Sequence, residues 1–169
     1  MTLWPVVTHG LLSGVILSAI LFPMILLLVR INPEIMLRDY PSDIQAKYGP
    51  MRDRSRRQRL PVALLFLAVM FGVIAASLAP VLNGIDPPRL FTTAFVHLFV
   101  MFFGFNMLDW LVLDWLIVVT LRPRFLILPG TEGMAGYADY AFHFRGFLIG
   151  IPITLVASLV LSGLVTILF

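Results

Sequence analysis

The ionisable residues that lie within apolar sequence are concentrated in one segment, residues 87–121. It contains His97, Asn106, Asp109 and Asp114, whereas the other long apolar segments carry almost no ionisable side chains. A charged side chain inside a bilayer is unfavourable, so such residues commonly pair with another group or serve a site. We therefore expect any chemistry to centre on this segment.

Further acids and bases follow that segment and complete a candidate inner-face polar cluster. Asp139 and His143 are four residues apart, so on a helix they would share a face and could hold a metal or act as an acid/base pair. Asp109 and Asp114 are five apart, about 140° around an α-helix, which predicts different partners for the two carboxylates. The cluster comprises Asp109, Asp114, Glu132, Asp139, His143, Arg122, Arg124 and Arg145.

This cluster has two interpretations. In the first, it is a catalytic or ion-binding site. In the second, the acids form ion pairs with the arginines of the neighbouring loops and fasten those loops to the third long helix. For Asp109, the arginines of matching depth are Arg30 and Arg145.

Two histidines form a second candidate site, in the outer leaflet. His9 and His97 lie at similar predicted depths in the first and third long helices. Two histidines at one level could ligate haem or a metal ion, or relay a proton. The alternative is two separate histidines, each hydrogen-bonded to a neighbouring serine or threonine.

The sequence lacks the sharper catalytic signatures. It has no HExxH, P-loop, GxSxG or CxxC motif, no paired-acid motif of the lipid phosphotransferases, and no internal repeat of the transporter kind. With no cysteine, the chain forms no disulfides and performs no thiol chemistry. The motifs therefore identify no cofactor and leave open whether the protein is an enzyme.

The composition predicts the elements that position these residues. Sixty per cent of the 169 residues are hydrophobic and 12% are charged, which is typical of an integral membrane protein. The apolar positions are consecutive rather than alternating, so the spans are helices and not barrel strands. We predict an all-α, polytopic transmembrane bundle that forms one domain, with four spans at about 3–29, 61–82, 90–111 (extending to 121) and 147–169.

Short helices are expected in the two long loops. Asn32-Pro33-Glu34 and Ser42-x-x-Gln45 have the pattern of helix starts, in the loop before residue 61. In the loop after residue 121, the pattern of residues 134–145 predicts a helix with one aromatic face. We expect both sets of helices to lie in the membrane interface.

Eight of the twelve basic residues lie in the loop between the first two spans. This asymmetry predicts a plasma (inner) membrane protein with both long loops in the cytoplasm and both termini outside. The densest run has no aromatic interleaving, so we expect anionic lipid headgroups rather than nucleic acid as its partner. It comprises Arg52, Arg54, Arg56, Arg57 and Arg59.

Small residues form ridges on three of the predicted spans and mark candidate faces for close helix packing. They also favour a homo-oligomer or membership of a larger membrane complex. The glycines concerned are Gly10, Gly14, Gly72, Gly146 and Gly150.

Three classes of function fit these patterns, and the sequence favours the first over the other two. The first is a non-enzymatic, oligomeric transport or membrane-complex component, which the small-residue ridges and the lack of motifs favour. The second is a membrane-embedded enzyme acting on a lipid or lipid-linked substrate at the cytoplasmic face, which the acid, histidine and arginine content of the last loop favours. The third is a histidine-ligated haem or metal protein, for which a purified sample's absorbance spectrum and metal content would be diagnostic.

Overall fold

The computed structural model describes residues 3–168, and regular structure in this part of the chain is helical throughout. Four helical stretches are long and apolar enough to cross a membrane. This result confirms the predicted all-α class and fits a multi-pass membrane protein. The long elements are α1 (Trp4–Ile31), α3 (Asp53–Leu82), α4 (Pro87–Leu108) continued by η2 (Asp109–Leu121), and α5 (Tyr140–Leu168).

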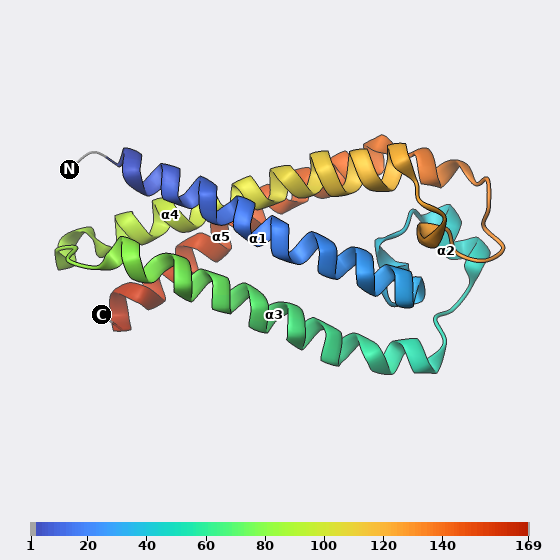
Figure 1. Ribbon diagram of the computed structural model, residues 1–169, viewed down its shortest axis with the longest axis horizontal. Coiled ribbons are helices and arrows are strands. Elements are labelled where there is room, and N and C mark those ends of the chain that lie inside the picture. Colours follow the sequence, from blue (N-terminus) through green and yellow to red (C-terminus); the bar gives the residue numbers. More distant parts are fainter. Residues whose placement is uncertain (1–2, 169) are drawn as a thin grey trace.

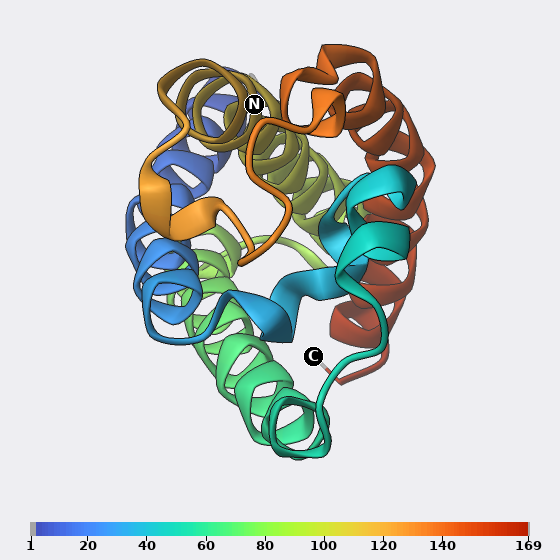
Figure 2. The ribbon, with the colours of Figure 1, turned by 90° about the vertical axis from the view of Figure 1, so that its right-hand side faces the viewer.

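The helices form an elongated bundle with two distinct ends (Figure 1). At the terminal end lie the start of α1, the α3–α4 turn and the end of α5. At the loop end, the two long connections fold over the bundle, as the end-on view shows (Figure 2). The short elements of the loop end are η1 (Pro33–Asp39), α2 (Ser42–Tyr48), η3 (Arg124–Leu126) and η4 (Ala135–Ala138).

Helix α4 is the centre of the bundle because it packs along both α1 and α5, whereas α3 is more loosely attached. Glycines allow the close approach of α1. A Cβ added at Gly10 would lie 2.9 Å from the carbonyl oxygen of His97, and one added at Gly14 would lie 2.7 Å from that of Met101. The buried apolar core is shared by α1, α3 and α4 and consists of Leu17, Leu21, Ile74, Leu78, Ala94, Leu98 and Met101.

The other three candidate packing glycines do not take part in the contact between α1 and α4. A Cβ added at Gly72 or Gly146 would have no atom of a neighbouring element within 4 Å, so neither glycine makes a close helix contact inside the described chain. At Gly150, the side-chain amide of Asn106 occupies the space of the missing Cβ. That amide donates to the carbonyl oxygen of Phe147 at 3.1 Å, which joins α4 to α5.

Two helices begin earlier than the sequence pattern predicts. Helix α3 begins at Asp53, so most of the arginine run lies on its first two turns. Helix α5 begins at Tyr140, so the separate interfacial helix predicted at 134–145 is wrong: η4 is followed directly by the long helix. The start is fixed by Asp139, whose carboxylate accepts the backbone N–H of Phe142 at 2.8 Å.

Beyond Leu108, the third long helix widens into a π-helix of 13 residues, η2. In a π-helix each N–H bonds to the carbonyl five residues earlier, instead of four. The last bond of this type joins the Arg122 N–H to the Ile117 carbonyl oxygen at 2.9 Å. The helix ends there because Arg122 takes a left-handed conformation, with φ at 42°, and Pro123 follows.

The two loops pack against each other in a small core of their own, made by Leu37, Ile44, Leu128 and Tyr137. The Tyr137 hydroxyl accepts the Leu128 N–H at 2.9 Å and lies 2.7 Å from the Thr131 hydroxyl. The loops are therefore an ordered cap on the bundle.

A buried carboxylate, Glu34, ties the first loop to α3. It is 1% exposed and accepts hydrogen bonds from the Arg52 backbone N–H at 2.5 Å, the Arg52 guanidinium at 2.8 Å and the Ser55 hydroxyl at 2.6 Å. Burial by itself raises the pKa of Glu34, but these hydrogen bonds and the Arg52 charge outweigh it, so its pKa lies below the ordinary value of 4.5. Glu34 is therefore ionised and paired near neutral pH.

Candidate functional site

The loop end contains a cavity of about 620 Å³ between α1, η1, η2 and α5, which we call the loop-end cavity. Part of its wall is apolar, formed by residues such as Ile25, Val29 and Ile149. Acidic, basic and phenolic side chains form the rest. The ionisable lining residues are Arg38, Asp39, Tyr40, Asp109, Asp114, Tyr137, His143 and Arg145.

The π-helix brings Asp109 and Asp114 to the same cavity. The prediction that these carboxylates diverge by about 140° assumed an α-helix, and it is wrong because η2 is wound more loosely. Since residues five apart are nearly one turn apart in a π-helix, both carboxylates face the same side. Widened turns of this kind often occur at functional sites.

An acid/histidine pair lies in the cavity wall. The Nδ1 atom of His143 is 3.1 Å from the Oδ1 atom of Asp114, and the two side chains are 10% and 24% exposed. A carboxylate at Nδ1 fixes the orientation of an imidazole and leaves Nε2 available for proton transfer. His143 therefore pairs with Asp114 on η2, and not with Asp139 as the spacing suggested.

Two further carboxylates of the cavity have no ion pair or hydrogen bond within residues 3–168: Asp39 and Asp109. Arg145, one expected partner of Asp109, instead lies 3.8 Å from Asp139. Asp39 is an exposed residue of the cavity lining. Desolvation of its carboxyl by the surrounding protein raises its pKa. The charge of Arg59 lowers this pKa, and the charge of Asp114 raises it further. The cavity therefore contains two carboxyl groups without an ion pair in the described chain, beside the Asp114–His143 pair.

The remaining members of the predicted inner-face cluster lie outside the cavity lining. Glu132 accepts the Gly130 N–H at 3.1 Å within its own exposed turn. Arg122 donates to the Val119 carbonyl oxygen at 3.0 Å, and Arg124 is exposed. The cluster therefore divides: Asp109, Asp114, His143 and Arg145 come together, while Glu132, Asp139, Arg122 and Arg124 do not line the cavity.

Sequence reasoning missed the contribution of the first loop to this site. Arg38, Asp39 and Tyr40 line the cavity mouth, opposite η2 and α5. One sequence signal for these residues was present: they lie at the end of η1, just before Pro41, and this end was predictable from the proline. The sequence pattern did not show that the chain folds this loop over the end of η2.

The predicted outer-leaflet pair lies at the terminal end of the bundle. The ring centroids of His9 and His97 are 5.2 Å apart, with planes tilted by 41°. Each ring also lies near a serine: His97 Nε2 is 3.1 Å from the Ser77 hydroxyl, and His9 Nδ1 is 3.5 Å from the Ser13 hydroxyl. The tight contact of α1 with α4 beside Gly10 leaves no room for a porphyrin between the rings.

The arginine run lies at the start of α3, with Arg52 just before its first residue. Arg52 is paired with Glu34, and Arg56 lies 3.9 Å from Asp53 in an exposed pair of little energetic weight. Arg54 and Arg57 are exposed, and Arg59 is partly exposed.

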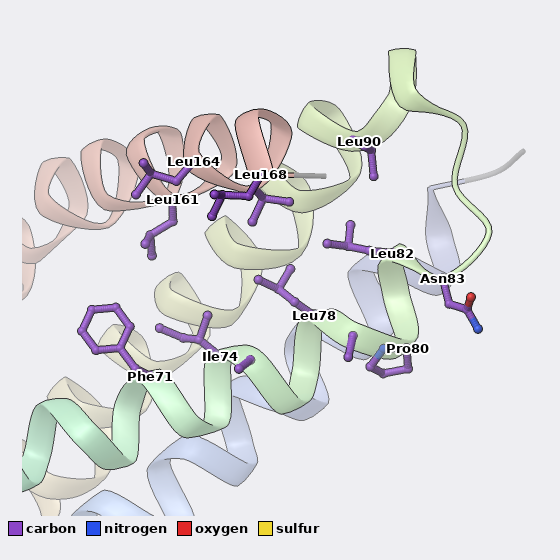
Figure 3. A pocket seen from close by; sticks show the side chains of 13 residues that line it. Phe71, Ile74, Leu78, Pro80, Leu82, Asn83, Leu90, Leu161, Leu164 and Leu168 are labelled. Atoms are coloured by element: carbon purple, nitrogen blue, oxygen red, sulfur yellow. The ribbon is translucent and has the colours of Figure 1, made fainter.

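A third feature is an apolar groove of about 930 Å³ between α3 and α5, near the terminal end (Figure 3). Leucine, isoleucine and phenylalanine side chains of the two helices line it, and Asn83 lies at its end (Figure 3). The groove carries no titratable side chain in the described chain.

Within residues 3–168, no three histidine, aspartate or glutamate side chains are arranged to hold one metal ion. Comparison with protein-family models, with curated proteins and with solved structures finds no match to this chain.

Proposed function

We propose that this protein is a membrane-embedded enzyme that acts on a lipid or another amphipathic molecule at the loop-end cavity. The observation that carries the proposal is the Asp114–His143 pair in the wall of a cavity that is lined by both apolar and ionisable side chains. An apolar pocket with a few convergent polar groups is the usual form of a small-molecule site.

Each part of the cavity has a role in this proposal. The apolar side chains of α1 and α5 hold the hydrocarbon part of the substrate. Arg38 and Arg145 bind an anionic headgroup at the mouth. Asp114 orients His143, whose Nε2 takes a proton from the reacting group and returns it to the leaving group. Asp109 stabilises the positive charge that His143 carries in between.

The orientation belongs to the same proposal. We place the loop end in the cytoplasm and both termini outside, in the plasma membrane, because basic residues concentrate at the loop end. Exposed arginines at the start of α3 then contact anionic lipid headgroups. The chain has no cysteine, so single cysteines at Arg57 and Gly84 should react with a membrane-impermeant reagent from opposite sides. Reaction of both from one side would exclude this topology.

The test of activity uses the full chain reconstituted in vesicles that contain a panel of lipids, with mass spectrometry of the products. We expect Asp114→Asn and His143→Gln each to lower turnover at least 100-fold, because each removes the general base or its orientation. Asp53→Asn is the control, since that carboxylate is 85% exposed and does not line the cavity. Equal turnover in all variants would reject the proposed chemistry.

A second candidate function is favoured by the groove between α3 and α5. Helix α3 is loosely packed, and the groove exposes apolar side chains to the membrane. These features suit a component of a homo-oligomer or a larger membrane complex. Mass measurement of the purified protein in lipid nanodiscs tests this alternative. A monomer that retains turnover would leave the enzyme as the only candidate of the two.

A further inference from the structure

We propose that His9 and His97 form a binding site for a single transition-metal ion, with copper(I) as its preferred occupant. This site is separate from the loop-end cavity and does not depend on the function proposed for it. It lies at the terminal end, where α1 and α4 are in close contact.

In the proposed site, the Ser77 hydroxyl donates to the Ile74 carbonyl oxygen at 3.0 Å and accepts the Nε2–H of His97, 3.1 Å away. In this tautomer His97 carries no proton on Nδ1. His97 is 0% exposed, and its Nδ1 atom is buried without a hydrogen-bond partner among the described residues.

On His9, the Ser13 hydroxyl donates to the His9 carbonyl oxygen at 2.8 Å. In the proposed site it also accepts the Nδ1–H of His9, 3.5 Å away, and the lone pair of His9 is then on Nε2. Each neutral imidazole thus offers one unshared electron pair to the shared ion.

The distance between the rings fits one shared ion. With metal–nitrogen bonds of about 2.0 Å and an angle of roughly 110–120° between them, two imidazole centroids lie about 5 Å apart. The observed separation is 5.2 Å. A linear arrangement would place the centroids about 6 Å apart, so the geometry indicates a bent site with room for one further ligand.

The further ligand has a path to the ion. A cavity of about 510 Å³ opens at the terminal end beside His9, and Val6, Thr93 and Arg89 also line it. Water or a small anion entering this cavity completes the coordination. The cost of burying an ion beside neutral ligands in a membrane rises with the square of its charge, which favours a monovalent ion such as copper(I) over Zn²⁺.

The experiment measures copper(I) transfer to the purified full-length protein from a chromogenic copper(I) chelator. We expect one equivalent to bind, and His9→Gln and His97→Gln each to weaken binding at least 10-fold. His143→Gln is the matched control, because it removes the chain's other histidine at the opposite end, and it should bind copper(I) as the wild type does. His9 is only partly buried, so its variant tests the site even where His97→Gln alters folding, which circular dichroism monitors.

A wild-type protein that takes no copper(I) from the chelator would overturn the proposal. Binding that is unchanged in the His9→Gln/His97→Gln double variant would also overturn it. Zn²⁺ bound as tightly as copper(I), with the same dependence on both histidines, would overturn the preference for a monovalent ion.

Discussion

The two halves of the third long helix, α4 and η2, accommodate ionisable side chains within apolar sequence in different ways. In the terminal half, α4 lies against the glycines of α1, and its one buried titratable residue, His97, is held by a serine hydroxyl. In the loop half, η2 widens, and its two carboxylates face a cavity with a histidine opposite. The first half is closely packed and the second is open.

This difference shows what each kind of polar group demands. A neutral imidazole can be buried between close helices when a hydroxyl bonds one of its nitrogens, as Ser77 bonds Nε2 of His97; its Nδ1 has no hydrogen-bond partner among the described residues. Carboxylates need space, water or an opposite charge, and the wider turn of a π-helix supplies space on the face that carries them. The type of polar side chain and the winding of the helix therefore account together for the tight packing around α4 and the open cavity beside η2.

The largest effect is expected at the close contact of the terminal half. Gly14→Leu should lower the free energy of unfolding by about 3 kcal/mol, because its Cβ would meet the Met101 carbonyl oxygen, which cannot move without the backbone. The matched control is Gly72→Leu, where the space is open. Thermal unfolding in detergent measures both. Equal losses in the two variants would show that close packing is not confined to α1 and α4.

The next effect concerns Glu34, which supports the loop half. Glu34→Gln should destabilise the protein by about 2 kcal/mol, because the donors of Arg52 and Ser55 would face an amide that cannot accept from all of them. Asp53→Asn breaks only an exposed pair and should change stability by less than about 0.5 kcal/mol. Denaturation in one detergent compares the two variants.

Glu34 should also make the stability of the protein depend on pH. The pKa of Glu34 is lower in the folded protein than its ordinary value of 4.5, so its contribution to stability is complete above that value. It is lost as the pH falls through the lower, folded pKa. Unfolding measured between pH 6 and acid should therefore show a steeper loss for the wild type than for Glu34→Gln. Parallel curves would contradict the assigned hydrogen bonds.

A smaller effect is expected in the cap over the cavity. Tyr137→Phe removes the oxygen that accepts the buried Leu128 N–H and should cost about 1 kcal/mol. Tyr140→Phe is the control, since the Tyr140 hydroxyl lies at the surface, 2.9 Å from the exposed Thr120 hydroxyl. Hydrogen exchange of the Leu128 amide gives a direct reading, and unchanged protection in Tyr137→Phe would reject the bond.

The sequence was sufficient to predict four long apolar helices because each contains a long run of apolar residues, but α3 and α5 begin earlier than those runs. Positions such as Gly10 and Gly14 were recognisable as a packing ridge, since small residues at this spacing lie on one helix face. Their partner was not recognisable, because the choice of α4 depends on contacts between distant segments. Gly72 and Gly146 have the same pattern without a close neighbour in the described chain.

The candidate site was only partly predictable for a similar reason. The sequence marked Asp109, Asp114 and His143 as polar residues in apolar surroundings. The hydrogen-bond register of η2, which decides whether residues five apart share a face, has no simple signature in residue types. The contribution of Asp39 depends on how the first loop folds over η2, which is a tertiary property.

The most direct test of this account uses cysteine labelling to read the register of η2. In a π-helix, residues 109 and 114 share one face, and residues 111 and 116 share another. In an α-helix, the pairs would instead be 109 with 116 and 111 with 114. For the naturally cysteine-free chain in lipid vesicles, we expect a water-soluble thiol reagent to label Asp109→Cys and Asp114→Cys rapidly through the cavity. Leu111→Cys and Leu116→Cys should stay unreacted, because lipid covers these exposed apolar positions of the span. Fast labelling at 109 and 116, with slow labelling at 114, would contradict the shared cavity.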